Sequence, residues 1–112
     1  MTEEVITRLT DYFFARMRLP EEIRKDPEER ESMRGHILSG KEKLNLIACG
    51  INIDYEADEF AKDLLYNYCF YERNDCAEKF SSAYRSSLIN LRHMAIAGKL
   101  KTESEGTEDA QA

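Results

Sequence analysis

Hydrophobic side chains recur at intervals of three and four residues through most of the chain, with polar side chains between them. This spacing predicts amphipathic α-helices. It covers four segments, near residues 3–17, 27–49, 57–73 and 76–97. The nearest candidate for a strand, residues 49–53, is too short to build a sheet. We therefore predict an all-α fold, a compact bundle of about four helices.

Each predicted helix has one apolar stripe that should face a common core. The stripe of the first helix consists of Val5, Leu9, Tyr12, Phe13 and Met17. The stripe of the second consists of Met33, Ile37, Leu44, Ile47 and Ile51, and Gly40 occupies the position between Ile37 and Leu44 where another apolar side chain would be expected. The stripes of the last two are Ala61, Leu64, Tyr68 and Tyr71, then Ala77, Phe80, Tyr84, Leu88, Leu91 and Ala95. Leu64, Leu88 and Leu91 lie mid-stripe and are predicted to be buried. Gly40 would allow another backbone to approach closely.

Residues that start and stop helices lie at the ends of these segments. The candidate N-terminal caps are Thr2, Asp26 (followed by Pro27) and, for the third helix, Asp54 or Asp58. Gly50 and Gly98 suit the C-terminal ends, since glycine adopts the left-handed conformation found there. Asp75 and Glu78 have the spacing of a capping box for the last helix.

Two segments lack the helical periodicity. Residues 19–31 are almost entirely charged and are predicted to form a solvated connector that leads into the second helix. Residues 99–112 have almost no apolar content and are predicted to be a disordered, acidic C-terminal tail. The chain is thus expected to hold a single helical domain at residues 1–98, followed by a tail at residues 99–112.

The charge of the chain bears on its partners and location. Its 112 residues carry a net charge of −6, which argues against specific nucleic-acid binding and against an anionic membrane surface. The start of the chain lacks the pattern of a signal peptide, and no apolar run approaches the ~18 residues that span a bilayer. We therefore expect a protein that is made in a cytoplasm.

No arrangement of catalytic or metal-binding residues emerges from the sequence. Cys49, Cys69 and Cys76 are odd in number and include no CxxC pair, so free thiols are expected. His36 and His93 lie far apart, whereas zinc sites use closely paired ligands. Neither a nucleophile elbow nor a glycine-rich phosphate loop occurs. We predict a protein without enzymatic activity, cofactor or metal.

The segment LLYNYCFYERNDCAEKF, residues 64–80, concentrates five aromatic rings. Helix geometry separates Tyr66 and Phe70 from the apolar face of the third helix. We therefore predict that Tyr66, Phe70 and the nearby Arg73 contact a neighbouring subunit rather than their own core. Base stacking on single-stranded nucleic acid also uses aromatic rings, but Arg73 alone does not form the basic groove that it needs.

The succession of segments carries a resemblance. One helix ends in LIACGI, an acidic turn NIDYEAD follows, and EFAKDLLYNYCFYE leads through ND into CAEKFSSAYRSSLINL. This order resembles the small head–tail connector proteins of long-tailed bacteriophages, also called DNA-packaging or head-completion proteins and often encoded in prophages. The likeness covers about residues 28–93, and its most specific parts are the turn at Gly50 and the last helix. The connector at residues 19–31 is longer than the family pattern.

The resemblance implies a structural role without catalysis. Proteins of this family form a homo-oligomeric ring of about a dozen subunits beneath the portal protein. The ring extends the DNA channel and provides the docking surface for a tail or head-completion protein, which places the protein at the head–tail junction of the virion. Two alternatives come from other classes: a cytoplasmic helical adaptor or regulator that binds a single protein partner, and a sequence-independent nucleic-acid binder, which the charge disfavours.

Overall fold

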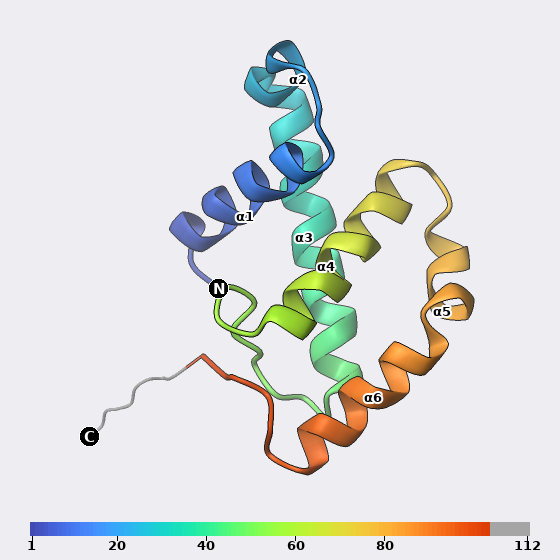
Figure 1. Ribbon diagram of the computed structural model, residues 1–112. Coiled ribbons are helices and arrows are strands. Elements are labelled where there is room, and N and C mark those ends of the chain that lie inside the picture. Colours follow the sequence, from blue (N-terminus) through green and yellow to red (C-terminus); the bar gives the residue numbers. More distant parts are fainter. Residues whose placement is uncertain (104–112) are drawn as a thin grey trace.

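Helix α3 (Pro27–Ile47) is the central element, and α1 (Glu3–Arg16), α2 (Glu21–Lys25), α4 (Glu59–Arg73) and α6 (Arg85–Ile96) all contact it (Figure 1). A 3₁₀ turn at Ala77–Lys79 and the short helix α5 (Phe80–Ala83) connect α4 to α6. The computed structural model describes residues 1–103. These residues contain no strand beyond a single antiparallel bridge between Ile53 and Thr102. The all-α prediction is confirmed. No helix among residues 1–103 is long and apolar enough to cross a membrane.

The core lies where α1 and α4 pack on α3. Helix α1 buries a face slightly rotated from the predicted stripe, namely Ile6, Leu9, Thr10, Phe13 and Phe14. Tyr12, placed in the core from the sequence, is instead 42% exposed. The predicted stripe of α3 is confirmed from Met33 to Leu44, and α4 buries Leu64 and Leu65 together. Helix α4 buries a broader face than predicted because α1 and α3 both contact it.

Gly40 marks the tightest approach between α3 and α4. A Cβ atom at this position would lie 2.7 Å from Leu65 Cδ1 and 2.7 Å from Tyr68 Cδ2. The prediction that Gly40 admits another backbone is therefore wrong in detail, because two side chains of α4 occupy the space. Gly35, on the same helix, has no neighbouring atom within 4 Å of such a Cβ.

The predicted N-terminal caps are confirmed for three helices. Side chains accept hydrogen bonds from the N–H groups of the first turn in α1 (Thr2), α3 (Asp26) and α4 (Asp58). The capping box at Asp75 and Glu78 is wrong. Asp75 takes a left-handed conformation with φ +58°, and the 3₁₀ turn that follows begins after Cys76 without a side-chain cap.

The predicted fourth helix is broken at Tyr84. The backbone of Tyr84 leaves the helical region at φ −114° and ψ 24°, between α5 and α6. The serine-rich sequence around it favours such a break, because serine hydroxyls compete for backbone hydrogen bonds. After the break, α6 buries Leu91 and Ala95. Leu64 and Leu91 are buried as predicted, but Leu88 is only half-buried because the bend turns it to the edge of the core.

The charged connector at residues 19–31 is ordered on its own chain. It forms α2 and the first turn of α3, separated by Asp26. Arg24 Nε donates to the Leu19 carbonyl, and Arg30 donates to the Arg24 carbonyl and to Asp11. The predicted connector is therefore largely helical, and these local hydrogen bonds stabilise its helical form.

The prediction that the tail begins at residue 99 is wrong for residues 99–103. Leu100 is buried, and the Lys101 N–H donates to Asp58 Oδ2 at 3.0 Å. Backbone hydrogen bonds also join this segment to the loop before α4, from Asp54 N to the Lys101 carbonyl and from Glu103 N to the Asn52 carbonyl. The low apolar content of this segment did not predict its packing, because main-chain hydrogen bonds make most of the contacts. The rest of the predicted tail, residues 104–112, lies outside the described residues.

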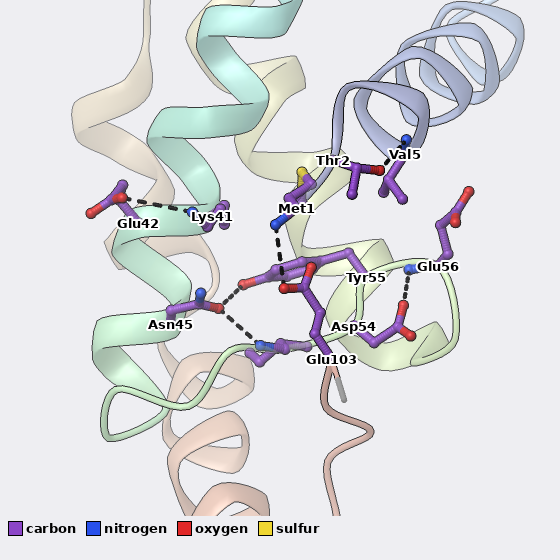
Figure 2. A network of polar contacts seen from close by, with 11 residues as sticks. Met1, Thr2, Val5, Lys41, Glu42, Asn45, Asp54, Tyr55, Glu56 and Glu103 are labelled. Atoms are coloured by element: carbon purple, nitrogen blue, oxygen red, sulfur yellow. Dashed lines mark hydrogen bonds and ion pairs between the residues drawn. The ribbon is translucent and has the colours of Figure 1, made fainter. Parts of the chain in front are cut away.

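Polar contacts join the loop before α4 to α3 and the two ends of the described chain to each other (Figure 2). Asn45 Oδ1 accepts hydrogen bonds from Tyr55 Oη at 2.7 Å and from Ile53 N at 3.4 Å. The N-terminal ammonium of Met1 pairs with Glu103 at 3.3 Å. Tyr55 is fully buried, and this burial, with the nearby carboxylates Glu103 and Asp58, raises the pKa of its hydroxyl. The network fixes the loop that leads into α4.

Candidate functional site

Four aromatic rings form a continuous row across α1 and α4, which we call the aromatic ridge: Tyr12, Phe13, Tyr66 and Phe70. The centroid distances along the row are 5.9 Å, 5.5 Å and 6.3 Å. These are contact distances for aromatic pairs, so each ring limits the movement of the next. Tyr12 and Phe70, at the two ends, are 42% and 44% exposed, whereas Phe13 is fully buried. The ridge thus exposes ring surface at its two ends and is anchored in the core through Phe13.

Tyr66 does not have the position predicted from the sequence. Its ring packs edge-on against Phe13 and is half-buried within its own subunit. The prediction that Tyr66 lies off its own core is wrong, because α1 covers this side of α4, and contact of Tyr66 with a neighbouring subunit stays a prediction. Phe70 keeps a largely exposed ring, as predicted. Tyr12 was missed as a surface residue, since its spacing also fits the core stripe of α1.

Two cations lie over the ridge. Arg16 Cζ is 3.9 Å from the centroid of the Tyr66 ring, and Lys62 Nζ is 3.9 Å from that of Tyr12. Asp63 holds Arg16 in place through a hydrogen bond of 2.6 Å. Partial burial opposes the charge of Arg16, but the hydrogen bond and the charge of Asp63 raise its pKa above the ordinary value. These contacts orient the Tyr66 and Tyr12 rings.

Arg73, the third predicted contact residue, lies one helical turn beyond Phe70 but points to α3. Its Nη2 atom is 3.3 Å from Glu29 Oε1. Glu29 belongs to a group of carboxylates on α2 and the start of α3 that we call the acidic corner: Glu21, Glu22, Glu28, Glu29 and Glu31. The Arg73–Glu29 pair and the Arg30–Asp11 pair connect this corner to both helices of the ridge. The aromatic ridge and the acidic corner are therefore neighbouring parts of one surface.

A second aromatic cluster continues from the ridge towards α5. Phe70 contacts Tyr71 at 6.4 Å, and Tyr71 contacts Phe80 and Tyr84 at 6.0 and 5.7 Å. Phe80 is buried and Tyr84 is half-buried, and partial burial raises the pKa of the Tyr84 hydroxyl. This cluster anchors α5 to the C-terminal half of α4, so its role is structural.

A partly buried polar chain between α3 and α4 links Ser39, Tyr68, Glu72 and His36. Ser39 Oγ lies 3.0 Å from Tyr68 Oη, which donates to Glu72 Oε2 at 3.2 Å. His36 Nδ1 lies 3.1 Å from the other oxygen of Glu72. These polar groups satisfy one another's hydrogen-bonding capacity at the interface of α3 and α4, so their arrangement is explained by the packing of the two helices.

The thiols and metal candidates of the sequence remain scattered. Cys69 is buried, and that burial raises the pKa of its thiol. Cys49 is exposed, and Cys76 donates to the Tyr71 carbonyl at 3.4 Å. Within residues 1–103, no group of three or more His, Cys, Asp or Glu residues is placed to hold a metal ion.

Comparisons with protein-family models, curated proteins and solved structures found no match to this chain.

Proposed function

We propose that this protein is a non-catalytic assembly protein that acts as a head–tail connector of a long-tailed bacteriophage or prophage. In this role it forms a ring of about a dozen subunits under the portal protein. The ring extends the DNA channel and provides the docking surface for a tail or head-completion protein. The protein would be made in the host cytoplasm and would function at the head–tail junction of the virion.

The observation that carries the assembly role is the aromatic ridge. Its two ends, Tyr12 and Phe70, expose apolar ring surface from different helices, and the rings between them are locked by the core. Tyrosine and phenylalanine are enriched where proteins meet, and rings that are already immobilised lose little entropy on binding. Both properties favour docking of a protein surface over binding of a small molecule.

Two further observations support the connector interpretation. The order of segments from LIACGI to CAEKFSSAYRSSLINL resembles that family. The net charge of −6 also suits the wall of a channel through which DNA slides, because a strongly cationic wall would retain phosphates. A cytoplasmic adaptor, the alternative function, would use the same aromatic ridge but would bind one partner and form no ring. The stoichiometry of assembly therefore distinguishes the two functions.

The test is assembly of a ridge variant. We would replace Tyr12 and Phe70 together by serine and measure association of the purified protein by analytical ultracentrifugation up to millimolar concentration, with electron microscopy of the particles. The parent should form annular oligomers, and the variant should remain monomeric while keeping its circular dichroism spectrum. Leu46→Ser is the matched control, since Leu46 is 76% exposed but lies outside the ridge.

Two outcomes would contradict the proposal. A parent protein that stays monomeric throughout, or that forms only a one-to-one complex with an unrelated protein, would favour the adaptor. A Tyr12→Ser/Phe70→Ser variant that assembles like the parent would show that the ridge is not a contact surface.

A further inference from the structure

The charges of this acidic chain are strongly segregated along the sequence. Residues 79–102 contain no Asp or Glu and carry five cations, Lys79, Arg85, Arg92, Lys99 and Lys101. All Asp and Glu residues of the protein therefore belong to residues 1–78 and 103–112 of the sequence. Within residues 1–103, none of these five cations forms an ion pair. The α5–α6 region thus presents positive charge that its own described neighbours do not neutralise.

Helix α6 displays part of this charge around exposed isoleucines. Ile89 and Ile96 are 46% and 67% exposed and lie two helical turns apart, on the side opposite the buried Leu91. Helix geometry places Arg85, Arg92 and His93 on that same side, where all three are exposed. We call this surface, Arg85, Ile89, Arg92, His93 and Ile96, the basic face. It runs the length of the helix, about 18 Å.

The composition of the basic face favours a protein partner over nucleic acid. The exposed isoleucines Ile89 and Ile96 lose their contact with water favourably only against another apolar surface. A phosphate backbone offers charge but no apolar counterpart, and the basic face has no exposed aromatic ring for base stacking. The matching surface should therefore combine apolar side chains with carboxylates.

This chain carries such a surface in the aromatic ridge and the acidic corner. Tyr12 and Phe70 provide exposed rings, and Arg73 and Glu29 join the end of α4 to the corner. Within the corner, Glu22 and Glu28 are exposed and form no ion pair with residues 1–103. Helices α1 and α2 lie at one end of the molecule, and α6 lies at the other (Figure 1).

We infer that the basic face of one subunit binds the aromatic ridge and acidic corner of a second copy of this chain. The charges of the two surfaces are complementary, and both have apolar side chains exposed. Because the surfaces differ, the contact is head-to-tail, the type that closes rings. This inference rests on the proposed self-assembly and names the two surfaces that meet.

The test exchanges the charges of the two surfaces. One variant carries Arg85→Glu and Arg92→Glu on the basic face, and the other carries Glu22→Lys and Glu28→Lys in the acidic corner. Each variant alone brings like charges together and should associate at least ~10-fold more weakly than the parent in sedimentation velocity. An equimolar mixture should regain association, because each variant then meets a surface of opposite charge.

Two controls separate specific contacts from net charge and from general hydrophobicity. Lys43→Glu removes an exposed cation outside both surfaces and should associate like the parent, unlike the single variant Arg92→Glu. The Ile89→Ser/Ile96→Ser variant should weaken association, whereas Leu46→Ser should not. Raising the salt concentration should weaken the parent's association, since it screens exposed charges.

The outcomes distinguish this inference from the proposed function. If the parent assembles but both charge variants assemble equally well, the inference is wrong and the proposed assembly stands. The inference is also wrong if the folded variants are monomeric and their mixture does not recover, or if loss of the basic face abolishes binding of a DNA oligonucleotide and leaves self-association intact. A parent that never self-associates would overturn both.

Discussion

Helices α1, α3 and α4 bury most of the core, whereas α5 and α6 together bury only Phe80, Leu91 and Ala95. The same contrast holds for charge. Ion pairs such as Arg16–Asp63 and Arg34–Glu3 connect elements of the first region, while no cation of residues 79–102 is paired within residues 1–103. The first region pairs many of its charges within its own chain, whereas α6, among residues 1–103, leaves its charged groups unpaired and two isoleucines exposed.

The comparison teaches which surfaces of a small helical protein are free to bind. Helix α6 buries only Leu91 and Ala95, and Leu88 and Met94 are half-buried, so most of its remaining side chains are exposed to solvent. The aromatic ridge is the exception in the first region, since its end rings stay exposed although their neighbours are buried. The acidic corner is a second exception, since Glu22 and Glu28 are exposed and form no ion pair within residues 1–103.

The largest effects are expected from leucines of the two regions. Leu64→Ala and Leu91→Ala each remove a buried side chain and should lower the free energy of unfolding by about 2–5 kcal/mol. Leu88→Ala should cost less, about 1 kcal/mol, because Leu88 is half-buried. Chemical denaturation measures all three. Equal losses for Leu88→Ala and Leu91→Ala would show that α6 faces the core differently.

Hydrogen exchange tests whether α6 and the α1, α3 and α4 region unfold separately. Loss of Leu91 should raise exchange mainly in α6, whereas loss of Leu64 should raise it across α1, α3 and α4, since local openings follow the packing of each element. A uniform increase in both variants would indicate that the two regions unfold as one unit.

Asn45 should show the next largest effect. Asn45→Ala leaves the buried Tyr55 hydroxyl and the Ile53 N–H without their acceptor and should cost about 1–3 kcal/mol. Adding Tyr55→Phe removes one of the stranded donors, so the double variant should cost less than the sum of the single ones. Thermal or urea unfolding of the four proteins completes this cycle, and strict additivity would argue against the hydrogen bond.

The two glycines of α3 should respond in opposite directions. Gly40→Ala places a methyl group against Leu65 and Tyr68 and should destabilise the protein by about 1–3 kcal/mol. Gly35→Ala meets open space and should stabilise it by roughly 0.5–1 kcal/mol through helix propensity. Denaturation of both variants checks this pair, and a stabilising Gly40→Ala would mean that α4 is less tightly packed than described.

The smallest effect concerns pH. The hydrogen bond from Arg8 and its charge hold the pKa of Glu56 below the ordinary 4.5. The folded pKa is lowered, so this pair stabilises the protein above the ordinary pKa and is lost as the pH falls through the lowered value. Because both groups are partly exposed, Glu56→Gln should cost less than about 1 kcal/mol at neutral pH and nothing in strong acid. Stability curves of both proteins between neutral and acidic pH test this, and a constant difference would contradict it.

The sequence alone determined the features of this protein that depend on interactions between residues close together in the chain, such as helical periodicity and helix capping. Helical periodicity set the all-α class and three long helices, and Thr2, Asp26 and Asp58 start them because a cap needs only its own first turn. The same rules singled out Phe70, since a residue off the apolar face of a helix tends to be exposed.

The tertiary structure decided what depends on distant contacts. Tyr12 and Tyr66 exchanged their predicted environments because α1 covers one side of α4, which no spacing within either helix reveals. Leu100 and Lys101 pack because the loop before α4 offers backbone groups and Asp58 to pair with. Sequence periodicity records which side of a helix is apolar, but the identity of the neighbour that covers it is a property of the assembled fold.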